Sequence, residues 1–149
     1  MKMKKIHWIG AGLSSVPGIR RLASTGQNIT VWNRTLEKAK NSINHVSSEN
    51  VKAKELNFEN LKKEINKNDI VISQLSANLH IKVAKICLEK DAHFASTSYL
   101  SQEIRDLHEK AKSKKLVFIN EIGLDPGIDH FFTHLLVDEL KKQNLGKID

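Results

Sequence analysis

KIHWIGAGLSSVPGIRRLASTGQNITVWNRT, residues 5–35, contains the pattern that decides the fold. An apolar run at 6–9 leads into Gly10-Ala11-Gly12, and a second apolar run follows at 29–32. The segment between them places apolar residues three or four positions apart, as an amphipathic helix does. Strand, glycine turn, helix and strand in this order are typical of the first unit of a doubly wound α/β fold, whose turn receives a dinucleotide.

The two glycines of this turn meet separate physical demands. Gly10 permits a tight backbone turn. Gly12 lacks a side chain, so a pyrophosphate can approach the N–H groups and the positive dipole end of the next helix. Ser15 stands where G-x-G-x-x-G has its third glycine, and we expect this departure to loosen the approach of helix to strand slightly. Gly10 and Gly12 are candidate cofactor-binding residues, although a lone G-x-G also occurs as an ordinary α/β turn.

The end of the second strand indicates which dinucleotide the turn would hold. An acidic residue normally binds the ribose 2'-hydroxyl of NAD at this place, but here the residues are Asn33, Arg34 and Thr35. A guanidinium beside a hydroxyl can bind a 2'-phosphate through charge-assisted hydrogen bonds, whereas a carboxylate would repel it. The pattern therefore favours NADP(H). The alternative is that Arg34 is a surface arginine and Thr35 a helix cap.

The rest of the chain repeats the alternation of strand and helix. Six short apolar runs occur at 6–9, 29–32, 51–56, 70–75, 93–99 and 116–119. Amphipathic segments separate them, at 16–23, 36–43, 61–65, 81–88 and 104–111. Continuous apolar strands are typical of a parallel sheet covered on both faces. We therefore predict a Rossmann-type α/β domain over residues 1–149, with a doubly wound parallel sheet of order 3-2-1-4-5-6.

Composition narrows the function classes. The chain has 24 Lys and Arg against 17 Asp and Glu, a net charge of +7, but these charges are spread along presumed helix surfaces. Aromatic residues make up only 5%, too few for a stacking platform, so no nucleic-acid partner is expected. No apolar stretch approaches the roughly 20 residues of a membrane span. The single cysteine, Cys87, fits a small core residue in a cytoplasmic protein.

A last amphipathic helix is predicted at 127–143. Its wide apolar stripe contains Ile128, Phe131, Phe132, Leu135, Leu136 and Leu140. Such a stripe needs a partner surface, so we expect either self-association or a further, substrate-binding domain toward which the helix leads. His130 and His134 share one face of this helix, but no third ligand is evident, and no metal site is predicted.

Two further segments place polar residues at predicted strand ends. STSYL occupies 96–100 and NEIGLDPGIDH occupies 120–130. In a parallel sheet these strand ends adjoin the crevice where a nicotinamide and a substrate meet. An ordinary strand-to-helix turn has a similar composition, so spacing alone leaves function and structure equally supported.

The sequences of several segments resemble those of one family. These are GAGLSSVP at 10–17, VWNRT at 31–35, NDIVISQL at 68–75, STSYLS at 96–101 and NEIGLDPGIDH at 120–130. Together they resemble saccharopine dehydrogenase of the NADP-dependent, L-glutamate-forming type. The resemblance implies an oxidoreductase of lysine metabolism that joins L-glutamate to aminoadipate semialdehyde and reduces the imine with NADPH, or catalyses the reverse.

The resemblance also implies roles for individual residues. The residues implied to bind the cofactor are Gly10, Gly12, Leu13, Asn33, Arg34, Thr35, Asn57, Ser76, Leu124, Asp125 and Pro126. Those implied to contact the substrate, saccharopine, are Ser98, Tyr99 and Asp125. The catalytic acid or base is not identified.

This sequence departs from the family at several points. An aspartate is common in the family where Asn57 stands, and bulkier residues follow the fourth strand in place of Ser76-Ala77-Asn78. Family members also continue into a substrate-binding domain and a returning helix, so we expect cofactor binding without efficient turnover. Two alternatives are a carboxynorspermidine-type imine reductase and a non-catalytic NADP-sensing module. The NEIGLDPGID sequence favours the saccharopine family. A sensor would have the glycine turn without substrate residues, so Ser98, Tyr99 and Asp125 argue against that alternative.

Overall fold

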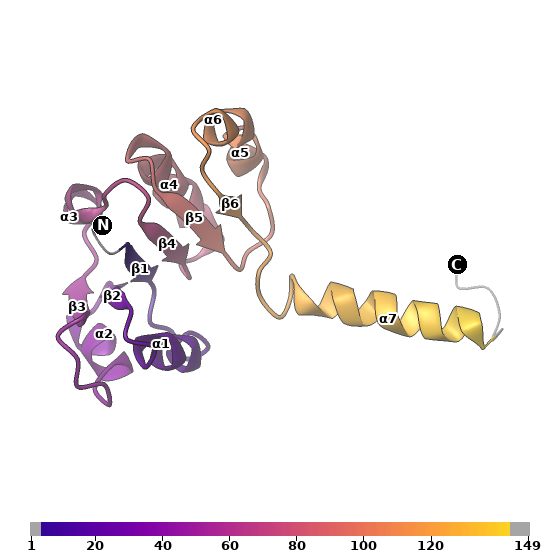
Figure 1. The fold of residues 1–149 in the computed structure, drawn as a ribbon, viewed down its shortest axis with the longest axis horizontal. Helices are drawn as coiled ribbons and strands as arrows, with labels where there is room; N and C mark the ends of the chain where they lie inside the picture. The colour runs from indigo at the N-terminus through magenta and orange to yellow at the C-terminus, as the bar shows by residue number, and fades with distance from the viewer. Residues whose placement is uncertain (1–3, 144–149) are drawn as a thin grey trace.

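A six-stranded parallel sheet with the order β3-β2-β1-β4-β5-β6 forms the centre of the protein (Figure 1). The computed structural model describes residues 4–143. The strands are β1 Lys5–Ile9, β2 Asn28–Asn33, β3 Val51–Glu55, β4 Ile70–Ser73, β5 His93–Ser96 and β6 Phe118–Ile119. The predicted parallel sheet and its strand order are confirmed.

Seven helices connect and follow these strands in the described part of the chain. They are α1 Val16–Ala23, α2 Leu36–Ser42, α3 Phe58–Glu64, α4 Ala77–Glu89, α5 Gln102–Arg105, α6 His108–Ser113 and α7 Ile128–Lys142. None of the described helices has both the length and the apolar character that a membrane crossing needs.

Two apolar cores lie on opposite faces of the sheet. On one face, α1 and α2 pack Ile19 and Ala39 against the strands. On the other face, α3, α4 and α5 pack residues such as Leu61 and Val83 against β1, β4 and β5. Each large buried aliphatic or aromatic side chain contributes about 1.5–3 kcal/mol through removal from water. Cys87 belongs to the second core, as predicted, and burial raises the pKa of its thiol.

The connections change face between β1 and β4, which are neighbours in the sheet. The helix after β1 lies on one face and the helix after β4 lies on the other. Register pairs Ile9 with both Trp32 and Ser73, so β1, β2 and β4 end at the same level. A crevice therefore opens at their carboxyl ends, where doubly wound sheets bind ligands.

One helical segment differs from the expectation. The helix predicted at 104–111 is divided into α5 and α6, because the Leu107 N–H donates to the Ile104 carbonyl three residues back and tightens the chain. The tight turn brings Ile104, Leu107 and Ala111 into buried positions. The helix predicted at 127–143 is present as α7, which extends away from the sheet, and none of its residues is buried (Figure 1).

The hydroxyl of Thr30, in the middle of β2, offers a stability prediction. Its Oγ1 is buried and has no hydrogen-bond partner among the described residues. Thr30→Val removes this unpaired group, and we expect the free energy of unfolding to rise by about 1 kcal/mol in urea titrations. Ser42→Ala is the matched control, because the buried Ser42 hydroxyl donates to the Ala39 carbonyl at 2.7 Å and its loss should destabilise. Equal destabilisation by both changes would contradict the prediction.

Candidate functional site

A pocket of about 440 Å³ lies at the carboxyl ends of β1, β2 and β4. It is lined by Gly10, Ala11, Gly12, Asn33, Arg34, Thr35, Lys38, Leu56, Phe58, Gln74, Leu75, Ser76 and Leu79. Six of the residues predicted to bind the cofactor are in this lining, and no carboxylate is. Its charged side chains, Arg34 and Lys38, are both cationic, which suits a ligand rich in phosphate.

Gly10 occupies a position that only glycine fits. Its φ is +104°, a conformation that other L residues rarely adopt, and an added Cβ would lie 2.7 Å from the Gln74 carbonyl oxygen. The approach is close because the Gly10 N–H donates to the Trp32 carbonyl and the Gln74 N–H donates to the Ile9 carbonyl, both at 2.7 Å. These bonds join the ends of β1, β2 and β4 into the floor of the pocket.

The turn after Gly10 presents free backbone donors. An added Cβ on Gly12 would meet nothing within 4 Å, so the space above it is open. Within the described chain, the N–H groups of Gly12, Leu13 and Ser14 donate to no partner. No acidic residue stands in the first turn of α1. Free N–H groups at the positive end of a helix form an anion site, and here they fit a pyrophosphate.

The missing third glycine is compensated one turn later. Ser15 is buried at the start of α1, and the helix packs tightly against the Trp8 side chain of β1 at Gly18. A Cβ on Gly18 would lie 2.9 Å from the Trp8 ring. The Trp8 indole N–H also donates to the Gly10 carbonyl at 3.0 Å, so the same side chain supports both the helix and the turn.

The side chains at the end of β2 have different roles. The Asn33 amide oxygen accepts from the Ala11 N–H at 3.1 Å, and its amide nitrogen donates to the Thr35 carbonyl at 3.1 Å. Asn33 therefore braces the glycine turn. Arg34 is exposed, and Thr35 begins α2 without a side-chain capping bond, so both polar groups are free for a ligand. Lys38 joins them from the first turn of α2 and was missed in the sequence, although it lies four positions after Arg34.

Apolar side chains form another part of the lining. Leu56 and Phe58 line the pocket, and the Lys82 ammonium lies 4.1 Å from the centre of the Phe58 ring. Asn57, implied to lie near the adenine, stands between them but uses its side-chain oxygen to cap α3, accepting from the N–H groups at 59 and 60. Phe58 offers a flat apolar surface of the kind that packs against an adenine ring.

The substrate contacts implied by the family resemblance come together on neighbouring loops. The Tyr99 phenol donates to the Asp125 carboxylate at 2.7 Å, and both residues are exposed. This hydrogen bond to Asp125 is the largest of the effects that raise the pKa of Tyr99. Ser98 lies beside Tyr99, with its hydroxyl 2.8 Å from the His80 ring. Leu13 and Leu124 are exposed, whereas Pro126 is buried. None of these residues lines the pocket at the glycine turn.

Comparison with known proteins decides the family. The family model described as the saccharopine dehydrogenase NADP binding domain matches residues 6–119. The chain belongs to this family. The match covers β1 through β6, which includes the glycine turn, the end of β2 and the Ser98–Tyr99 loop. The resemblance seen in the sequence is therefore confirmed, and the cofactor of the family domain is NADP.

Similar proteins carry related names. Saccharopine dehydrogenase [NADP(+), L-glutamate-forming] of Pyricularia oryzae is 34% identical over 99% of this chain and 33% of its own length. Alpha-aminoadipic semialdehyde synthase of Arabidopsis thaliana is 36% identical over 77% of this chain and 11% of its own length. The solved apo saccharopine dehydrogenase (L-Glu forming) of Saccharomyces cerevisiae superposes with a TM-score of 0.79 at 32% identity, covering 93% of this chain and 32% of that one. The chain spans about a third of the length of the two saccharopine dehydrogenases and a smaller share of the synthase.

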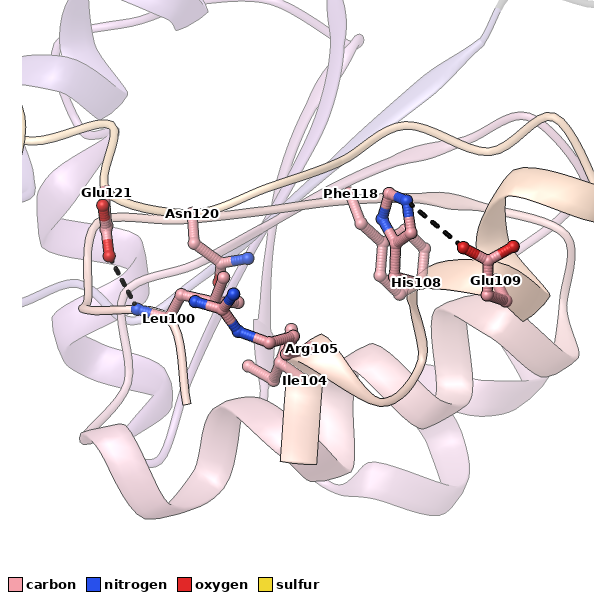
Figure 2. Close-up of a pocket in the computed structure, with 8 residues that line it drawn as sticks. All are labelled: Leu100, Ile104, Arg105, His108, Glu109, Phe118, Asn120 and Glu121. Carbon is pink, nitrogen blue, oxygen red and sulfur yellow. Dashed lines mark hydrogen bonds and ion pairs between the residues drawn. The ribbon is translucent and has the colours of Figure 1, made fainter. Parts of the chain in front are cut away.

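A second and larger pocket, of about 520 Å³, lies beside β6 and was not anticipated (Figure 2). Its lining residues are Leu100, Ile104, Arg105, His108, Glu109, Phe118, Asn120 and Glu121. Figure 2 shows the Arg105 guanidinium near Asn120 and the Glu121 carboxylate accepting from the Leu100 N–H. This pocket has no glycine turn. The smaller pocket at the carboxyl ends of β1, β2 and β4 is therefore the candidate cofactor site.

Proposed function

We propose that this chain holds NADP(H) with its pyrophosphate over Gly12 and its 2'-phosphate against Arg34, Thr35 and Lys38. The observation that carries the proposal is a lining with two cations, open space above Gly12 and no carboxylate. An acidic residue at the end of β2 would repel the 2'-phosphate, and none lines the pocket. The adenine then lies on the side of Leu56 and Phe58.

We further propose that the domain serves an oxidoreductase acting on saccharopine. The bound cofactor would supply or accept the hydride at the imine carbon between glutamate and aminoadipate semialdehyde. Tyr99 and Asp125 would hold the amino group of the substrate, because their hydrogen-bonded pair places a carboxylate where a cationic nitrogen can bind. Leu124 and Pro126 would lie along the nicotinamide. The names of the relatives support this reaction, and the remaining two thirds of those relatives would supply other substrate contacts.

Arg34→Ala tests the cofactor assignment. Fluorescence titration of the purified chain should show tighter binding of NADPH than of NADH. Removal of one charge-assisted contact should weaken NADPH binding by about tenfold or more and leave NADH binding unchanged. Arg105→Ala is the matched control, because Arg105 lines the larger pocket and should not affect either cofactor. A loss of NADPH binding in the Arg105 variant alone would place the cofactor in the larger pocket and contradict the proposal.

Two other expectations from the sequence stay predictions. Self-association would cover the exposed apolar side chains of α7, among them Phe131 and Leu135, as would a further domain of the kind the longer relatives have room for. A monomeric light-scattering profile at high concentration would count against self-association. A cytoplasmic location is supported by the buried single cysteine, whereas the mouse and rat relatives are named mitochondrial.

A further inference from the structure

A buried histidine lies between the cofactor crevice and the Ser98–Tyr99 loop. His80, in the first turns of α4, is only 2% exposed. Its Nδ1 lies 2.9 Å from the Ser73 hydroxyl, at the end of β4, and its Nε2 lies 2.8 Å from the Ser98 hydroxyl, after β5. One imidazole therefore joins the carboxyl ends of two neighbouring strands.

Burial and the absence of a charged partner determine the protonation of this ring. Burial lowers the pKa of His80, and both of its hydrogen-bond partners are neutral hydroxyls. A neutral imidazole carries one N–H donor and one acceptor nitrogen. The two hydrogen bonds of His80 must therefore run in opposite senses, one donated by the ring and the other donated to it.

Ser73 selects between the two tautomers. Its side chain is fully buried, and His80 is the partner of its hydroxyl in the described part of the chain. If Nδ1 carried the proton, Ser73 would accept that bond and its own O–H would be buried without an acceptor, which is unfavourable. If Nε2 carries the proton, the Ser73 O–H donates to Nδ1 and the ring N–H donates to the Ser98 oxygen, so both buried hydrogens have acceptors. The buried Ser73 hydroxyl thus favours the tautomer with its proton on Nε2.

We propose that His80 is a positioning residue, whose Nε2–H donates to the Ser98 oxygen and leaves the Ser98 O–H free to donate to a carboxylate of the bound substrate. The inference rests on the proposed function, in which Ser98 contacts saccharopine. Ser98 is partly exposed, so its free O–H can reach a ligand. The neighbouring Asp125 carboxylate suits the substrate amine, and a donor at Ser98 suits a substrate carboxylate.

Two conservative variants separate positioning from a general structural role. The side-chain nitrogen of glutamine can take the place of Nε2, so His80→Gln should keep the bond to Ser98. Asparagine reaches only as far as Nδ1, so His80→Asn should keep the contact with Ser73 and lose that with Ser98. Both variants stay neutral and polar. We expect His80→Asn to weaken saccharopine binding to the NADP-loaded chain about tenfold, and His80→Gln to weaken it less than about threefold.

The measurements are nitrogen NMR of the His80 ring, titration of the NADP-loaded chain with saccharopine followed by chemical shifts, and NADPH affinity as the control. The expected results are an Nε2–H ring, a perturbed Ser98 amide and unchanged NADPH affinity in both variants.

Ser73→Ala should release the tautomer preference and weaken saccharopine binding, which keeps a test available if His80→Asn does not fold. Three outcomes would overturn the inference. One is a ring proton on Nδ1, and another is an equal loss of saccharopine affinity in the two His80 variants. The third is a Ser98 amide shift that saccharopine does not change in a chain that binds NADPH. Failure to bind NADPH would instead overturn the proposed function, while the ring spectrum would still test the tautomer.

Discussion

Gly10→Ala is expected to lower the free energy of unfolding by about 3 kcal/mol and to weaken NADPH binding more than tenfold. The alanine must keep a φ near +104°, and its Cβ would lie 2.7 Å from the backbone oxygen of Gln74. That oxygen belongs to a chain segment anchored to β1 by a hydrogen bond, so it cannot move aside without breaking the floor of the pocket. Urea unfolding and NADPH fluorescence titration measure the two effects on the same protein.

Two other glycines separate these effects. Gly12→Ala adds a methyl group to open space, so stability should change by less than about 0.5 kcal/mol while NADPH binding falls at least tenfold. Gly26 has a φ of +76° but no atom within 4 Å of an added Cβ, and it does not line the pocket. Gly26→Ala should cost about 1–2 kcal/mol of stability and leave NADPH binding intact.

The three variants therefore predict three distinct patterns. Gly10→Ala affects stability and binding, Gly12→Ala affects binding alone, and Gly26→Ala affects stability alone. If Gly10→Ala destabilises no more than Gly26→Ala, the contact with Gln74 relaxes easily and does not shape the pocket. If Gly12→Ala leaves NADPH binding unchanged, the pyrophosphate does not lie over this turn.

The fold and the cofactor half of the site were predictable because their signals are local. The apolar runs at 70–72 in β4 and at 116–119 around β6 are continuous, and the amphipathic segments between strands have helical spacing, so the alternation alone indicates a doubly wound sheet. Gly10, Gly12 and Arg34 belong to one strand-turn-helix-strand unit whose geometry is common to many proteins. Their positions in the pocket follow from that unit and require no knowledge of distant segments.

Contacts between distant segments could not be predicted in this way. Gly18 supports the cofactor turn only because the pleat of β1 directs Trp8 against α1. The exposed Lys38 has the composition of any surface lysine, and its place beside Arg34 depends on where α2 begins. The contacts of His80 with Ser73 and Ser98 depend on the register between β4 and β5. The local sequence pattern therefore determines where the site lies, whereas these long-range contacts determine which further side chains support it.

A second buried histidine makes stability depend on pH. His7, in β1, is fully buried on the face of the sheet covered by α3 and α4. The Trp32 indole N–H, which can only donate, lies 3.1 Å from His7 Nδ1, so the ring proton must be on Nε2. Nε2 lies 3.3 Å from the Asp69 carboxylate, which also accepts from the backbone N–H groups of Lys5 and Asn66. His7 is thus held as a neutral donor to Asp69.

The direction of the pH effect follows from the pKa of His7. Burial, with a smaller contribution from the charge of Lys5, lowers this pKa from 6.5 to about 4, although Asp69 acts in the opposite direction. Between these two values the unfolded chain binds a proton at this residue that the folded chain does not. Stability is therefore greatest above the unfolded pKa and falls as the pH decreases from 6.5 toward 4, by about 2–3 kcal/mol in total.

His7→Gln isolates this contribution from those of the carboxylates. Glutamine can accept from Trp32 or donate to Asp69 but does not titrate, so the variant should lose about 1–2 kcal/mol at neutral pH through poorer packing and hydrogen bonding. The wild-type chain loses stability on acidification and the variant lacks this loss, so the advantage of the wild type should fall by about 2 kcal/mol between about pH 7 and pH 4.5. The two proteins should then be equally stable at about pH 4.5, or the variant the more stable. Urea unfolding of both proteins across this range measures the difference directly. A difference that stays constant with pH would mean that His7 titrates alike in the folded and unfolded chains, and that its buried neutral state does not contribute to the acid sensitivity of the fold.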